Sequence, residues 1–131
     1  MSDSIPEITK NLKNSDMIIK GDGKVYIKNH NSKPAMLLIH ATWCSHCVRF
    51  KPTYIKLSKQ LNSNGINFPC YAIESTELNN QKQLSDALKF RGFPSIKYID
   101  QTGKVINDYN GPRNIDSLLK DICKVYHMCY K

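Results

Sequence analysis

Two cysteines three residues apart, Cys44 and Cys47, are the side chains of this chain best suited to do chemistry. They follow the apolar run 35–39, which predicts a buried strand, and they open a segment with the apolar period of a helix. Cys44 would then stand at a helix N-terminus, where unpaired backbone N–H groups and the helix dipole favour a thiolate over a thiol. The sequence therefore predicts a nucleophilic sulfur at Cys44 and a resolving sulfur at Cys47.

The elements that must position this pair are predicted from the apolar pattern of the chain. Residues 66–74 predict a strand, residues 78–90 a helix, and residues 96–99 with 105–107 an antiparallel hairpin. The helix after the cysteines has one apolar face, made of Phe50, Tyr54, Leu57 and Leu61. The last helix has an inner face made of Ile115, Leu118, Leu119, Ile122 and Tyr126.

The first part of the chain has a different pattern. Residues 8–12 predict a short helix, and residues 17–19 and 25–27 predict two short strands that form a hairpin or a bent edge. Residues 29–34 predict a polar loop, because this segment has no helical pattern and ends in a proline.

Trp43-Cys44-Ser45-His46-Cys47, followed by Pro52, resembles the active-site motif of the thioredoxin superfamily. The histidine before the second cysteine makes the motif resemble that of the protein disulfide isomerase branch of the superfamily. Two further strings strengthen the resemblance: Arg-Gly-Phe-Pro-Ser at 91–95, and Tyr-x-Gly-x-Arg at 109–113.

The resemblance implies an α/β fold, namely a single thioredoxin-like domain with a central mixed β-sheet flanked by helices on both faces. We expect residues 1–32 to form an N-terminal extension with a short helix and a hairpin or edge strands. Residues 33–126 would form the thioredoxin-like domain, and residues 127–131 a C-terminal tail. Where the family enters its sheet by strand, helix and strand, the first helix has moved upstream here or is missing.

The resemblance also implies an activity, that of a protein-disulfide oxidoreductase or isomerase acting on protein disulfides or dithiols. Cys44 would be the nucleophile and Cys47 the resolving cysteine, with no cofactor and no metal ion. Pro94 is implied to be cis. It would bind the incoming polypeptide together with Trp43, Gly92 and Phe93.

Three residues are implied to tune the redox pair: Ser45, His46 and Arg113. A cationic His46 imidazole near Cys44 would stabilise the thiolate and make the disulfide more oxidising. The reduction potential is then expected near that of the isomerase, at about −180 mV, rather than that of thioredoxin, at about −270 mV. The arginine of the family motif can swing toward the active site and tune the second cysteine.

One departure from the family concerns the proton of Cys47. Members usually carry a buried acid six residues before the first cysteine, and this position is Leu38. The usual lysine partner of that acid falls at about Ala72. Both positions are apolar, so no buried charge is left unpaired. We expect slower turnover, with Arg113, His46 or a water as the substitute in the proton route.

Composition limits the partners of the chain. With 131 residues, 40% hydrophobic and 23% charged, the chain is long enough for one compact domain. Nineteen Lys and Arg against eleven Asp and Glu give a net charge of +8, but they are scattered, so we do not expect nucleic-acid binding. The longest apolar run, 35–39, is too short for a membrane span. Protein substrates are expected, a homodimer stays open, and the recycling redox partner is unassigned.

The two ends of the sequence favour a cytoplasmic location. Residues 1–7 have no signal-peptide pattern, and residues 127–131 are neither an ER-retention signal nor a prenylation box. Richness in Lys, Asn, Ile and Tyr is typical of an AT-rich genome. If the source is a large DNA virus, the virion is the alternative location.

The five cysteines leave at least one thiol unpaired in a monomer, which favours a reducing setting. Cys70 is interpreted as a small buried apolar residue. Cys123 and Cys129 are interpreted as surface or partly buried thiols, with a redox pair or a link between two chains as open alternatives.

The same residues are compatible with two other functions. A non-catalytic thioredoxin-like module would use the surface around Trp43 and Pro94 to hold a protein partner. A tetrahedral zinc site would take two pairs of ligands, Cys44 with Cys47 and Cys123 with His127. Loss of both active-site cysteines would leave the binding module intact, and zinc content would reveal the metal site.

Overall fold

The computed structural model describes residues 5–129, so residues 1–4 of the expected extension and residues 130–131 of the expected tail lie outside it. Its central element is a five-stranded mixed sheet in the order β1-β5-β4-β6-β7. Strands β1, β4 and β5 run parallel, whereas β6 is antiparallel to both β4 and β7. The strands are β1 Lys10–Leu12, β4 Ala35–His40, β5 Cys70–Glu74, β6 Ser95–Ile99 and β7 Val105–Tyr109.

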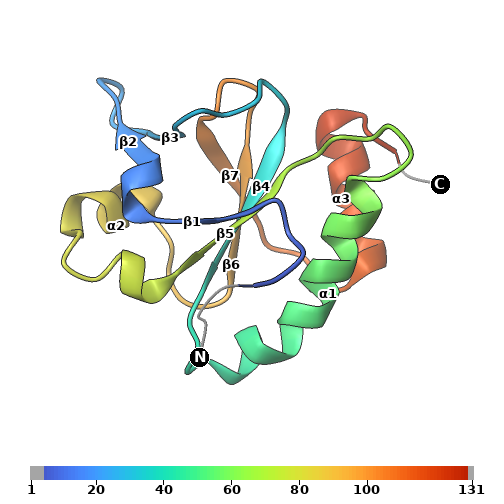
Figure 1. The fold of residues 1–131 in the computed structure, drawn as a ribbon, viewed down its shortest axis with the longest axis horizontal. Helices are drawn as coiled ribbons and strands as arrows, with labels where there is room; N and C mark the ends of the chain where they lie inside the picture. Colours follow the sequence, from blue (N-terminus) through green and yellow to red (C-terminus); the bar gives the residue numbers. More distant parts are fainter. Residues whose placement is uncertain (1–4, 130–131) are drawn as a thin grey trace.

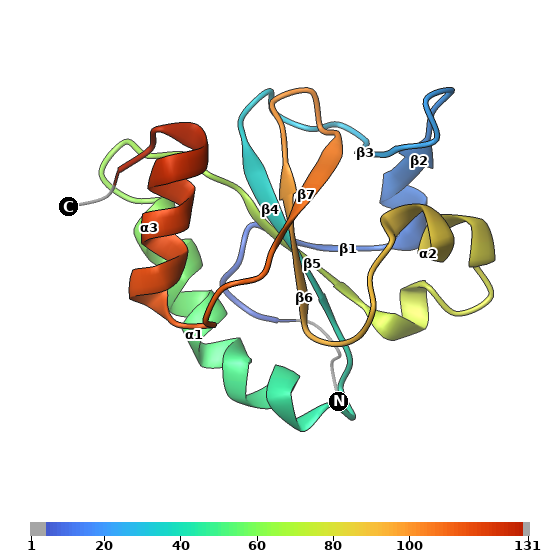
Figure 2. The same ribbon diagram turned by 180° about the vertical axis from the view of Figure 1, so that it is seen from behind.

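Helices cover both faces of this sheet. Helices α1 (Ser45–Leu61) and α3 (Ile115–Tyr126) lie side by side on one face, and α2 (Lys82–Leu88) lies on the other (Figure 1; Figure 2 shows the view from behind). The single thioredoxin-like α/β domain predicted from the sequence is therefore confirmed.

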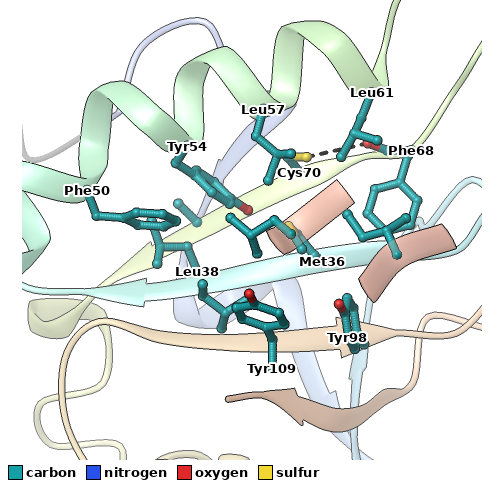
Figure 3. Packing of buried hydrophobic residues seen from close by; sticks show 14 of the residues in the cluster. Met36, Leu38, Phe50, Tyr54, Leu57, Leu61, Phe68, Cys70, Tyr98 and Tyr109 are labelled. Atoms are coloured by element: carbon teal, nitrogen blue, oxygen red, sulfur yellow. Dashed lines mark hydrogen bonds between the residues drawn. The ribbon is translucent and has the colours of Figure 1, made fainter. Parts of the chain in front are cut away.

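The core under α1 and α3 is built from alternate residues of the strands. Met36 and Leu38 of β4 point to this face, as the period of a strand requires. The predicted apolar face of α1 packs onto them, and Tyr54 donates a hydrogen bond from its hydroxyl to the Tyr71 carbonyl at 2.6 Å. Figure 3 shows this packing, with the side chains of α1 above those of the strands. The buried α1 residues of this core are Phe50, Tyr54, Leu57 and Leu61.

The other residues of β4 point to the opposite face and form a second core. Ala35, Leu37 and Ile39 belong there to one buried cluster with Leu84 and Leu88 of α2. The hairpin of β2 (Met17–Ile19) and β3 (Val25–Ile27) closes the same core, and it confirms the two strands predicted for this region. Because both faces of β4 are covered, this strand is buried along its whole length, which explains its uninterrupted apolar sequence.

The short helix predicted over residues 8–12 is wrong, because this segment contains strand β1. Thr9 exchanges backbone and side-chain hydrogen bonds with Cys70, and β1 continues along β5 in parallel register. The exposed edge of β5 is thereby paired, which a helix at this place would leave open. The 3₁₀ turn η1 (Asn14–Asp16) and the β2–β3 hairpin then replace the first helix of the usual fold.

Two other predicted elements are shorter than expected. The strand predicted over 66–74 begins at Cys70, because the Asn62 side chain binds both backbone groups of Phe68 and ties this segment to the end of α1. The helix predicted over 78–90 is limited to α2, which follows the 3₁₀ turn η2 (Ser75–Glu77). Helix α2 ends at Leu88, because the next residue, Lys89, has a left-handed conformation. The predicted hairpin and last helix are confirmed.

Within residues 5–129, the structure has no helix with both the length and the apolar character needed to cross a bilayer.

Candidate redox site

Cys44 and Cys47 lie where strand β4 passes into helix α1. Cys44 is the N-cap residue of the helix, and its sulfur accepts a hydrogen bond from the Cys47 backbone N–H at 3.3 Å. Both are free thiols, 8% and 6% exposed. The position predicted for the pair is confirmed, with the first sulfur over the helix N-terminus and the second one turn inside.

The loop that carries Cys44 is held by a carboxylate from the neighbouring strand. Glu74 ends β5 directly beside His40 of β4, and it accepts a hydrogen bond from the Thr42 backbone N–H at 3.2 Å. Cys44 itself donates its backbone N–H to the Ala41 carbonyl at 3.2 Å, which closes a tight turn. Sequence reasoning missed Glu74, although an acid at the end of an apolar strand was a signal for such a role.

The two thiols differ in acidity. Burial opposes ionisation of Cys44, but hydrogen bonds from the Cys47 thiol and from the backbone N–H groups of Cys47 and His46, with the charge of Arg113, lower its pKa below the ordinary value. Burial and the hydrogen bond to Cys44 raise the pKa of Cys47 to about 12, against the opposing effect of Arg113. Cys44 therefore ionises more readily than Cys47, as a nucleophile and a resolving cysteine would require.

The loop 91–95 lies against Cys44. The Phe93–Pro94 peptide bond is cis, as expected, and the Cys44 thiol donates to the Phe93 carbonyl at 3.5 Å. Ser95 donates its hydroxyl to the Gly92 carbonyl at 2.7 Å, which fixes the turn before the proline. Phe93 therefore contacts the Cys44 sulfur, and Gly92 and Pro94 are its neighbours in the same loop.

Trp43 forms an exposed apolar surface next to the pair. Its side chain is 74% exposed and meets the Phe93 ring edge-on, with 5.4 Å between the ring centres. Val48, on the first turn of α1, is also exposed. The tryptophan is not a core residue, which agrees with the position predicted for it.

His46 lies on the first turn of α1, and its Nδ1 is 2.9 Å from the Arg49 guanidinium. Its backbone N–H donates to the Cys44 sulfur and contributes to the lowered pKa of that thiol. Ser45, the first residue of α1, is exposed beside it. The redox roles of both side chains stay predictions.

Arg113 is held near the cysteines by the string that follows β7. The Tyr109 hydroxyl donates to the Pro112 carbonyl at 2.5 Å and folds this segment back on the strand. A Cβ atom on Gly111 would stand 2.6 Å from that hydroxyl, so the close approach requires glycine. The spacing of Tyr109, Gly111 and Arg113 therefore has a structural reason, and the Arg113 charge reaches both sulfurs.

With the geometry established, the comparison with known proteins decides the family. A sequence model of the thioredoxin family matches residues 20–124. The chain belongs to the thioredoxin family.

Within this family, the chain is similar to protein disulfide-isomerases. It is 34% identical over 80 residues to the protein disulfide-isomerase of Datisca glomerata, and 33% identical over 85 residues to that of Ricinus communis. These regions cover 61% and 65% of this chain but 16% and 17% of the relatives. The chain thus spans about a sixth of the length of the curated relatives it matches.

Solved structures agree on the fold. The first thioredoxin domain of mouse protein disulfide-isomerase A4 has a TM-score of 0.58 and 26% identity, covering 74% of this chain and 64% of that one. The Trx4 domain of ERdj5 has a TM-score of 0.66, covering 94% of this chain and all of that domain. At 15% identity, this second likeness concerns the fold alone.

Leu38 lies directly opposite Ala72, and both are fully buried in the core under α1. Strand register therefore pairs the two apolar residues at the positions where the resemblance implied an acid and a lysine.

The remaining cysteines do not join the redox pair. Cys70 is buried as predicted, and burial raises the pKa of its thiol to about 12. The prediction of free thiols at Cys123 and Cys129 is wrong, because these two form a disulfide that closes the end of α3 onto the following segment.

The zinc site drawn from Cys44, Cys47, Cys123 and His127 is not assembled. Cys123 is bonded to Cys129, and residues 5–129 contain no group of three or more His, Cys, Asp or Glu side chains arranged to hold a metal ion.

Proposed function

We propose that this chain is a thiol–disulfide oxidoreductase that acts on protein disulfides or dithiols through Cys44 and Cys47. One observation carries the proposal: the Cys47 backbone N–H donates to the Cys44 sulfur at the N-terminus of α1. This contact favours the thiolate of Cys44, whereas the burial of Cys47 keeps that thiol protonated. A nucleophile and a reserve thiol are therefore present within one helical turn.

In the reducing direction, the Cys44 thiolate attacks one sulfur of a substrate disulfide. The substrate S–S bond breaks, one substrate thiolate leaves and takes up a proton, and a mixed disulfide with Cys44 remains. Cys47 then loses its proton and attacks the Cys44 sulfur. The second substrate thiol is released, and two electrons have passed from the Cys44–Cys47 pair to the substrate. The reverse sequence oxidises a substrate dithiol.

The surroundings of the pair suit a polypeptide substrate. Phe93, which precedes the cis proline Pro94, contacts the Cys44 sulfur, and the exposed Trp43 ring packs on Phe93. In this proposal, the incoming chain lies along this loop with its cysteine above Cys44. The likeness to protein disulfide-isomerases supports a protein rather than a small-molecule substrate.

Loss of the acid at Leu38 means that another group assists deprotonation of Cys47. Arg113 lowers the pKa of this thiol by its positive charge, although burial dominates. We propose that Arg113 and a water take over this step, and that exchange is slower than in relatives that keep the acid.

The function is tested by single cysteine variants assayed for reduction of a protein disulfide. Cys44→Ser should abolish the activity, and Cys47→Ser should accumulate a mixed disulfide between Cys44 and the substrate, visible by mass spectrometry. The control is the double variant Cys123→Ser/Cys129→Ser, which should retain the activity. Full activity in Cys44→Ser would contradict the proposal.

A second candidate function, a non-catalytic binding module, is favoured by the exposure of Trp43 alone. Such a module would hold its partner in the variant Cys44→Ser/Cys47→Ser and lose it in Trp43→Ala. An enzyme would lose exchange activity in the first variant.

We keep the cytoplasm, or the virion of a large DNA virus, as the proposed location. The Cys123–Cys129 disulfide counts against a strongly reducing setting, since such bonds persist mainly in oxidising compartments. The redox state of Cys123 and Cys129 in cell extracts would show whether the surroundings of the protein are reducing or oxidising.

A further inference from the structure

A pocket of about 220 Å³ opens beside Pro94. Its lining includes the start of β6, the end of β7 and the segment that leads to Arg113. Ile96 and Tyr109, both buried, supply apolar surface. Two exposed arginines, Arg91 and Arg113, belong to the same lining.

The charges around this pocket are not balanced. Asp108 is the one acid of the lining, and its carboxylate lies 2.5 Å from the Lys97 ammonium, which is almost fully buried. Lys97 also donates to the Lys89 carbonyl at 3.0 Å, so it is fixed beside Asp108. With Asp108 neutralised in this way, the charges of Arg91 and Arg113 are left in excess.

The pocket lies next to the reacting sulfur along the chain. Phe93 accepts the hydrogen bond of the Cys44 thiol, and the following residue, Pro94, already lines the pocket. The pocket lining therefore begins one residue along the chain from the contact with Cys44. The volume suits one side chain, since pockets for whole small molecules are larger, at roughly 300–1,000 Å³.

We propose that this pocket receives an acidic side chain of the substrate, Glu or Asp, close to its reactive cysteine. The methylene groups lie on the apolar surface of Ile96 and Tyr109, and the carboxylate pairs with Arg91 and Arg113. Guanidinium groups bind carboxylates by two parallel hydrogen bonds, which lysines do not offer. This inference rests on the proposed oxidoreductase function and specifies its substrate class.

The test compares peptide disulfides that are identical except for Glu, Gln or Lys at one position flanking the cysteine. One set is made for each position within two residues on either side, and the rate constant of reduction is measured. We expect one position at which Glu reacts at least about fivefold faster than Lys, with Gln between them, at low salt. High salt should reduce this ratio by screening.

Arg91→Gln should bring the Glu-to-Lys ratio close to one, because Arg91 lies on the surface and its loss leaves the core intact. Arg113→Gln should lower the same ratio as well as the overall rate. The control is Arg49→Gln, an exposed arginine of α1 outside the pocket lining, which should keep the ratio.

The outcomes separate the two proposals. If the protein reduces a small uncharged disulfide but shows no Glu preference at any position, the acidic subsite is wrong and the oxidoreductase function stands. An equal loss of preference in Arg91→Gln and Arg49→Gln would also overturn the subsite, since it would indicate general charge attraction. If no disulfide is reduced at all, the proposed function itself fails.

Discussion

Leu38 of β4 and Ala72 of β5 lie directly opposite each other on two parallel strands, and both are buried in the core that α1 covers. The resemblance to thioredoxin-family active sites implied an acid and a lysine at these two positions. An apolar pair costs nothing in desolvation, but it offers no acceptor for a proton. The redox chemistry proposed here therefore proceeds without the buried acid.

Leu38→Glu should accelerate thiol–disulfide exchange, because a carboxylate at this depth could accept the proton of Cys47. We expect a rate increase of up to about tenfold, below the usual range for general bases because Ala72 leaves the acid without its partner. The variant should lose about 2 kcal/mol of stability through burial of a polar group.

The matched control is Leu38→Gln, which has the size of the glutamate but does not take up the proton. It should lose similar stability and gain no rate. Equal rates for Leu38→Glu and the native protein would show that the missing acid does not limit exchange.

Arg113→Gln should shift the pH dependence of Cys44 alkylation. The native pKa of Cys44 lies below its ordinary value, so alkylation should reach its half-maximal rate at a lower pH than for an ordinary cysteine. Removal of the Arg113 charge takes away one of the stabilising contributions, and the half-maximal rate should move to higher pH. The measurement is the rate of iodoacetamide reaction with Cys44 in a Cys47→Ser background, from pH 4 to pH 10.

In the same series, Arg113→Lys should restore most of the native curve, since it keeps the charge. An unchanged curve in Arg113→Gln would contradict the electrostatic role assigned to this residue.

Glu74 should make the stability of the domain depend on acid pH. Burial opposes ionisation of this carboxyl, but hydrogen bonds from Thr76, Ser75 and Thr42 outweigh it and lower its pKa below 4.5. A lowered folded-state pKa contributes stability that is present above the unfolded value and is lost as pH falls through the folded value. The free energy of unfolding should therefore decrease below about pH 4.5.

Glu74→Gln should lose about 1 kcal/mol at pH 7 and show a flatter decrease in acid, as measured by urea unfolding at several pH values. It should also slow exchange at Cys44, because Glu74 holds the Thr42 turn. A variant with the same acid profile as the native protein would exclude Glu74 as the responsible group.

The Cys123–Cys129 bond, which lies outside the redox site, should stabilise the domain. It closes a loop between cysteines six residues apart, for which the chain-entropy estimate is about 2 kcal/mol. Cys123→Ser/Cys129→Ser should unfold at lower urea by this amount, and dithiothreitol should no longer affect it. If the native protein and the variant unfold alike without reductant, the bond contributes nothing to stability.

Much of the site followed from local sequence. Cys44, Cys47 and Pro94 stand in short strings whose neighbours determine their geometry, so their relation was predictable. Glu74 and the Lys97–Asp108 pair were not, because these contacts join strands whose register was unknown. The contact of His46 with Arg49, one helical turn away, was not predicted either.

Residues 8–12 also show that local sequence does not predict pairing between distant strands. The spacing of Ile8 and Leu12 fits one helix face, yet these residues belong to different cores, because β1 pairs with the edge of β5. Only long-range hydrogen bonding selects the strand at this place. A three-residue strand has too little pattern of its own to be predicted.

The reduction potential of the Cys44–Cys47 pair tests the central proposal most directly. It is measured in glutathione buffers on the Cys123→Ser/Cys129→Ser variant, with the fluorescence of Trp43, the single tryptophan, as the signal. The stabilised Cys44 thiolate predicts one reversible two-electron transition, nearer about −180 mV than the −270 mV or so of thioredoxin. The absence of any reversible transition, or the same transition after Cys44→Ser, would contradict a redox function for this pair.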